Sequence, residues 1–168
     1  MFDDHLRSIA QRIQFNPHDL DLFVEGIVTY HVVIEGVLAM TGQHTILKYL
    51  TDHDIYPGFR EGFSRVEQDE HRHIAFGVRF LAEACEREPR YRKLIEEKLR
   101  ELVPVAAQVF VPPGTEDPSD FVSYDIHSAE IYGFAYRALK RRMGVVGVKV
   151  PPAEELMPGP IDQVGAAA

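Results

Sequence analysis

The apolar residues of this chain recur every three or four positions, which is the spacing of helices that bury one face, and no stretch alternates as a sustained strand would. The pattern predicts an all-α protein whose helical domain covers residues 1–144. Pro, Gly and small residues prevail afterwards, so residues 145–168 are expected to form an extended, partly disordered tail. Helices are expected at residues 2–15, 17–42, 44–51, 59–88, 91–111 and 119–143.

The helix expected at 17–42 is apolar on nearly every side between residues 26 and 40, which indicates burial from several directions. Glu35 is the only acidic residue of that stretch, and no Lys or Arg lies between Asp19 and Gln43 to pair with it. Burying an unpaired charge costs several kcal/mol, so Glu35 needs a partner from elsewhere. In the later helices, Pro104 is expected to produce a kink and Ser119 to act as an N-cap.

Charge and composition exclude several classes of protein. The formal net charge of -8 argues against a nucleic-acid surface, and the basic run at residues 140–142 is expected to end a helix, where cations meet the helix dipole. Cys85 is the only cysteine, so an internal disulfide is excluded. The N-terminus does not resemble a signal peptide, and no apolar stretch approaches the roughly 20 residues of a membrane span. We therefore expect a cytoplasmic protein with no membrane or nucleic-acid partner.

Candidate metal ligands lie on two of the expected helices. Glu70 and His73 form a Glu-x-x-His motif, and positions three apart project from one helix face, so the two side chains can bind one ion together. The motif alone is weak evidence, but it borders the apolar residues 74–77. Metal coordination would also neutralise Glu35. A glutamate on one helix with Glu-x-x-His on the next is half of the ligand set by which ferritin-like bundles hold two metal ions.

Four segments together carry a family resemblance: Tyr30 with Glu35, the run from Gly36 to Gly42, Asp69-Glu70-x-x-His73-x-Ala75-Phe76-Gly77, and Glu101-Leu102-Val103-Pro104-Val105. They resemble the second half of ribonucleotide reductase small subunit-like carboxylate proteins, and most closely the R2-like ligand-binding oxidases. The resemblance covers most of residues 19–144 and implies an incomplete ferritin-like helical bundle.

The resemblance also implies a site. Glu35, Glu70 and His73 would be metal ligands, and Asp69 would orient a histidine ligand from outside the coordination sphere. Tyr30 would be the catalytic tyrosine that becomes linked to an aliphatic side chain by oxidation. The cofactor would be a dinuclear Fe/Fe or Mn/Fe centre that activates O₂, next to a pocket for a long-chain aliphatic ligand that we expect to be lined by residues such as Val33, Leu38 and Phe76.

The chain departs from this family in two ways. The first half, with another Glu and another Glu-x-x-His, is missing, so either the chain is a truncated piece, which we favour, or two copies pool their half-sites in a homodimer. Gln43 stands where the ligand-binding oxidases have a tyrosine, which weakens the assignment to that subgroup only.

Helix geometry sets a condition for Tyr30 to take part in the site. On a regular α-helix, side chains five residues apart point about 140° apart around the axis, so Tyr30 and Glu35 would lie on different faces. A π-bulge would bring the two together. His31 is four residues before Glu35, and a buried, hydrogen-bonded histidine is favoured over a third nitrogen ligand.

The leading functional hypothesis is therefore a non-haem dimetal oxidoreductase. A ribonucleoside-diphosphate reductase small subunit ranks second, because residues 145–168 contain no Tyr or Trp for a redox-active tail. A non-catalytic helical module that binds metal or a protein partner is the third reading. The sequence does not indicate the substrate, the metal or the reductant.

Overall fold

The computed structural model describes residues 2–162 and confirms an all-α protein with one small hairpin. The hairpin joins β1 (Val122–Ser123) to β2 (Ile126–His127) in antiparallel register. The helices are η1 (Phe2–Leu6), α1 (Arg7–Phe15), α2 (Leu20–Ile27), η2 (Val28–Ala39), α3 (Met40–Asp52), α4 (Pro57–Arg87), α5 (Tyr91–Ala107), η3 (Gln108–Phe110), α6 (Ser128–Val146) and α7 (Ala153–Leu156).

The segments α2, η2 and α3 form one continuous helical run, which contradicts the expected break near Gly42. Asp19 caps its start by accepting a hydrogen bond from the backbone N–H of Leu22 at 3.2 Å. A Cβ at Gly42 would meet no atom within 4 Å, so this glycine reflects neither a turn nor a close contact. A single glycine weakens a helix by only about 1 kcal/mol, and the packing of the flanking turns overrides it.

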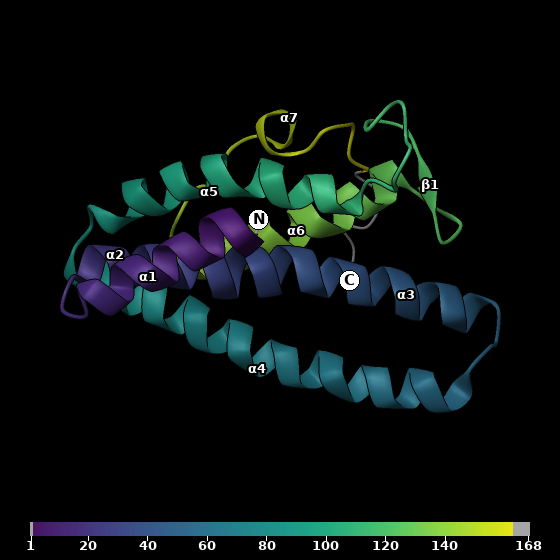
Figure 1. Ribbon diagram of the computed structural model, residues 1–168, viewed down its shortest axis with the longest axis horizontal. Helices are drawn as coiled ribbons and strands as arrows, with labels where there is room; N and C mark the ends of the chain where they lie inside the picture. The colour runs from purple at the N-terminus through teal and green to yellow at the C-terminus, as the bar shows by residue number, and fades with distance from the viewer. Residues whose placement is uncertain (1, 163–168) are drawn as a thin grey trace.

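The centre of this run, η2, lies between α4 and α5 and also contacts α6 (Figure 1). Val28 and Val32 of η2 are fully buried, as are Val24 of α2, Leu81 of α4 and Leu99 of α5. Each such side chain contributes roughly 1.5–3 kcal/mol by leaving water. Burial on several sides was the expectation for this segment, and the structure confirms it.

By length and composition alone, the run Leu20–Asp52 could cross a membrane, which corrects the expectation that no stretch is long enough. Within residues 2–162 it is the one helix that passes this test, with a mean hydropathy of 1.6. However, 61% of its most apolar window is buried inside the protein. Its apolar character is thus accounted for by its position between α4, α5 and α6.

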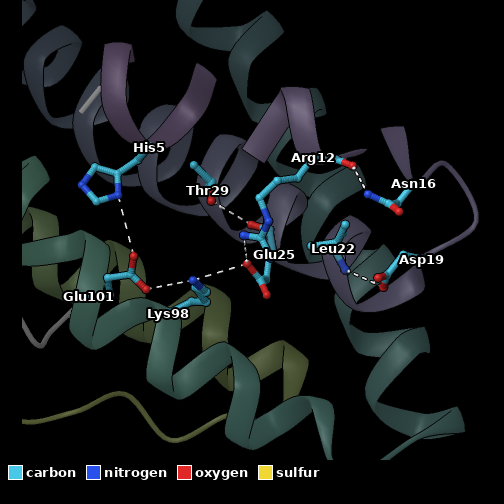
Figure 2. Close-up of polar contacts among 9 residues, drawn as sticks. All are labelled: His5, Arg12, Asn16, Asp19, Leu22, Glu25, Thr29, Lys98 and Glu101. Carbon is cyan, nitrogen blue, oxygen red and sulfur yellow. Dashed lines mark hydrogen bonds and ion pairs between the residues drawn. The ribbon is translucent and has the colours of Figure 1, made fainter. Parts of the chain in front are cut away.

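An ion-pair network fastens the N-terminal helices to α5 (Figure 2). Glu25 of α2 accepts from Arg12 of α1 at 3.1 Å and lies 3.3 Å from Nζ of Lys98. Lys98 also contacts Glu101 at 2.8 Å, and Glu101 lies 3.7 Å from His5. Because Glu25 and Lys98 are mostly shielded from solvent, these pairs are screened less than ordinary surface ion pairs.

A second polar cluster joins the start of α2 to the start of α5. Arg90 binds Asp21 with two nitrogens at 2.8 and 2.6 Å, and the hydroxyl of Tyr91 donates to the same carboxylate at 3.0 Å. The hydrogen bonds from Arg90 lower the pKa of Asp21 below its ordinary value.

The last long helix begins at Ser128 and not at Ser119, because the hairpin occupies the residues between them. Tyr124 and Asp125 form its turn with positive φ angles of 50° and 58°. Ser119 instead donates from its hydroxyl and its backbone N–H to Asp117 at 2.7 and 2.8 Å. The expected N-cap at Ser119 was therefore wrong. The helix α5 continues through Pro104, as its expected range of 91–111 indicated, and the kink expected at Pro104 stays a prediction.

The segment after α6 is packed against the bundle, which corrects the expectation of a partly disordered tail. Gly147 ends α6 in the left-handed conformation (φ 75°). Val148, Leu156 and Met157 are then buried, and α7 lies over α5 (Figure 1). The remainder of the tail, residues 163–168, lies outside the described residues.

Candidate metal centre

Three side chains from two helices converge at the centre of the η2–α4 contact. Glu35 comes from η2, and Glu70 and His73 come from consecutive turns of α4. One ligand atom from each lies within 4.8 Å of the others. Nδ1 of His73 is 3.6 Å from Oε1 of Glu35 and 3.7 Å from Oε2 of Glu70. The structure thus brings together the three residues that the resemblance implied as ligands.

Burial differs sharply among the three. Glu35 is only 5% exposed, as its apolar neighbours along the chain indicated. Oε2 of Glu70 is buried and has no hydrogen-bond partner among the described residues. The side chain of His73 is 60% exposed. Two carboxylates and one imidazole are oxygen and nitrogen donors of the kind that manganese and iron accept, so this donor set fits a metal ion.

The orphaned Oε2 of Glu70 is the clearest sign of a missing partner. Burying a polar atom without a hydrogen bond costs about 1–3 kcal/mol, and more when the group is charged. Among the described residues, no donor lies within hydrogen-bond distance of this oxygen, and Nδ1 of His73 is 3.7 Å away. A cation between Glu35 and Glu70 would neutralise both carboxylates.

A π-helix places Tyr30 beside Glu35, which is the arrangement that the resemblance requires. The segment Val28–Ala39 has π-helical hydrogen bonding, and the backbone N–H of Met40 bonds to the carbonyl of Glu35, five residues back. Residues five apart therefore share a side of the helix, which they would not do in an α-helix. The negative charge of Glu35, more than burial, raises the pKa of the Tyr30 phenol. The Tyr30 side chain is 42% exposed.

His31 contacts Glu35 directly, since its Nδ1 lies 2.6 Å from Oε2 of that carboxylate. The imidazole is mostly buried, with 17% of its surface exposed. This confirms a hydrogen-bonded histidine at position 31. The sequence spacing of four residues had indicated that the two side chains share a face.

Arg142 is a residue whose role the sequence analysis missed. It was expected to serve the C-terminal end of its own helix, but α6 continues to Val146. Its Nη1 instead donates to the backbone carbonyl of Gly36, next to Glu35. Burial lowers the pKa of the Arg142 guanidinium to about 10. The basic run at residues 140–142 was the only feature of the sequence that singled out Arg142. Because such runs are common at helix ends, it did not indicate a contact with another helix.

Asp69 does not contact a histidine among the residues that the structure describes. Its carboxylate is 62% exposed and pairs with Arg72 one turn later on α4. The orienting role that the resemblance implied thus has no partner within residues 2–162. This ion pair is solvent-exposed on both sides, and such pairs contribute little to stability.

The residues expected to line an aliphatic pocket lie in different environments. Val33 is fully buried in the core, Leu38 is half-buried, and Phe76 is 59% exposed on α4. Because their exposure differs this much, the three side chains do not form one buried lining within residues 2–162.

No family model matches the chain.

Proposed function

We propose that this chain supplies half of a carboxylate-bridged dimetal centre of the Fe/Fe or Mn/Fe type and belongs to an O₂-activating oxidoreductase. Support for the proposal comes from one observation above all: Glu35, Glu70 and His73 offer ligand atoms within 4.8 Å of one another, and a buried oxygen of Glu70 has no hydrogen-bond partner among the described residues. When bound, such a metal pair supplies O₂ activation and one- or two-electron oxidation. The family resemblance supplies the reaction class, with an R2-like ligand-binding oxidase as the model.

The protein residues have distinct tasks in this proposal. Glu35 and Glu70 hold the ions with oxygen ligands, and His73 adds one nitrogen ligand. Tyr30, placed beside Glu35 by the π-helix, is the oxidisable side chain at the site. A tyrosine phenol is protonated at neutral pH, so oxidation of Tyr30 must also remove a proton.

Three ligands leave two ions under-coordinated, so the proposed centre needs a second half-site. A second copy of the chain would bring four carboxylates and two imidazoles together, which is the inventory of ferritin-like dimetal bundles. Additional helices from a longer form of the protein would do the same. The exposure of His73 and Phe76 on α4 is consistent with a face that another helical pair covers.

Metal binding tests the proposal directly. Anaerobic titration of the apo-protein with Fe²⁺ or Mn²⁺ should show binding in the micromolar range or tighter, followed by O₂ consumption in the iron-loaded sample. Glu35→Gln and Glu70→Gln should each weaken binding at least about tenfold, in line with the loss of a metal ligand. Glu86→Gln, an exposed position on α4, is the matched control and should bind as wild type does. Wild-type protein that takes up no metal would refute the proposal.

The exposure of His73 favours one second candidate, a helical module that binds a single ion without catalysis. This candidate predicts metal uptake without O₂ consumption and without the near-ultraviolet absorption of an oxo-bridged iron pair. The same iron-loaded sample distinguishes the two functions.

A further inference from the structure

We propose that His31 is a positioning residue that holds Glu35 in its ligating orientation, and that Gly77 is required because the imidazole of His31 lies against it. This inference rests on the proposed metal site. It assigns a role to two residues outside the three candidate ligands.

The contact between His31 and Glu35 is short and shielded. Nδ1 of His31 lies 2.6 Å from Oε2 of Glu35, and the two side chains are 17% and 7% exposed. An ionised carboxylate can only accept, so Nδ1–H is the donor whenever Glu35 carries its charge. Hydrogen bonds to charged groups are roughly twice as strong as neutral ones.

The bond divides the two oxygens of Glu35 between two tasks. Oε2 is held by His31, while Oε1 is the oxygen that lies 3.6 Å from Nδ1 of His73. His31 therefore leaves Oε1 facing the other candidate ligands. Without this hydrogen bond, the Glu35 carboxylate could rotate. Metal binding would then have to fix its orientation, and the entropy lost in doing so would lower the affinity for the metal.

The position of the imidazole is set from the other helix. A Cβ built at Gly77 of α4 would clash first with Cβ of His31 and would lie 2.9 Å from its Cγ and 3.3 Å from its Cδ2. A larger residue would therefore push the whole His31 side chain away from α4, because turning the ring leaves Cβ in place. Phe76 and Tyr30 contact the same ring edge-to-face, with centroids 5.6 and 5.1 Å away. The glycine thus creates the space that His31 occupies, and the aromatic rings limit its rotation.

The geometry of the site favours a positioning role for His31 over direct coordination of the metal. The three candidate ligands offer atoms within 4.8 Å of one another, and His31 is not part of that group. Residues that hold a ligand by a hydrogen bond typically change metal affinity 10–100-fold when they are removed. That range is the expected effect for His31.

Cobalt titration of the apo-protein tests this assignment, because Co²⁺ reports both affinity and ligand geometry through its visible absorption. His31→Ala should raise the dissociation constant for Co²⁺ about 10–100-fold. His31→Gln, whose amide can donate to a carboxylate one turn away, should recover part of the affinity. Gly77→Ala removes no polar atom but should also weaken binding, because its Cβ would push the His31 side chain away from α4. His71→Ala, an exposed histidine next to Glu70, is the control and should behave as wild type.

Circular dichroism of each apo-protein verifies that the helices persist. A dissociation constant for His31→Ala within about twofold of wild type would overturn the inference and leave the metal site intact. No rescue by His31→Gln, together with a visible spectrum that has lost one nitrogen ligand, would also overturn it, because His31 would then be a ligand. Wild-type protein that fails to bind Co²⁺ would refute both the inference and the proposed function.

Discussion

The guanidinium of Arg142 donates to the backbone carbonyl of Gly36 and so connects α6 to the π-helix, 106 positions away along the chain. The bond lies one residue from Glu35. Among residues 2–162, no carboxylate forms an ion pair with Arg142, so the carbonyl is its main polar contact. A π-helix is rare because its hydrogen bonding is less favourable than that of an α-helix, and contacts of this kind help to stabilise it.

Removing this bond should destabilise the protein. For Arg142→Ala we expect the free energy of unfolding to fall by about 1.5–3 kcal/mol, the usual value of a hydrogen bond to a charged group. Denaturant unfolding measures the change. Arg141→Ala, the exposed neighbour, should stay within about 0.5 kcal/mol of wild type. Equal effects of the two substitutions would show that the contact with Gly36 contributes nothing.

Two glycines of the same helical run should respond in opposite directions to alanine. A Cβ at Gly36 would lie 3.0 Å from the carbonyl oxygen of His31 and 3.4 Å from Nη1 of Arg142, so Gly36→Ala should destabilise the protein. At Gly42 a Cβ meets nothing within 4 Å, and Gly42→Ala should stabilise it by about 0.4–1 kcal/mol. Thermal unfolding of both variants checks the pair. A stabilising Gly36→Ala would mean that Arg142 moves aside without cost.

The buried oxygen of Glu70 predicts a conflict between stability and metal binding. Because Oε2 has no hydrogen-bond partner among the described residues and only a 3.7 Å contact with the exposed His73, Glu70→Met should raise the stability of the apo-protein by about 1 kcal/mol. The same variant should lose any increase of the unfolding temperature that metal produces. Glu86→Met, an exposed change on the same helix, should do neither. A destabilised Glu70→Met apo-protein would contradict the view that this carboxylate lacks a partner.

Acid should release the contact between α2 and α5 at Asp21. Arg90 lowers the pKa of Asp21 below 3.8, so the carboxylate stabilises the fold above pH 3.8. This contribution is lost as the pH falls through the lowered pKa, where the carboxylate of the folded protein becomes protonated. Wild type should therefore be more stable than Asp21→Asn at neutral pH, and the difference should disappear in acid. A difference that is independent of pH would point to packing alone.

Metal should drive association if two copies complete the site. Loading with Mn²⁺ should double the mass measured by light scattering and convert the resonance spectrum of isolated Mn²⁺ into that of an exchange-coupled pair. Val66→Glu, on the exposed surface of α4 one turn before Glu70, should prevent both changes. Val109→Glu, which is also solvent-exposed but lies on η3, should not. Metal-loaded protein that stays monomeric with isolated ions would require that a longer chain supply the second half-site.

Several features of the site could be predicted because they depend on spacing along one helix. Glu70 and His73 share a face through their interval of three residues, and the apolar neighbours of Glu35 indicated its burial. The π-helix around Tyr30 was a condition set by geometry, and the structure meets it. The hairpin before α6 and the packed tail were not anticipated, because two-residue strands carry little periodicity and because burial of the tail depends on its contacts with α5.

By itself, the sequence determined the helical class and the chemical nature of the candidate ligands, since these follow from local propensity and from side-chain identity. Only the tertiary structure decided that Glu35 meets Glu70 and His73, that His31 lies against Gly77, and that Arg142 reaches Gly36. These relationships join distant parts of the chain. They arise from the way in which η2, α4 and α6 pack, and no local pattern specifies that packing.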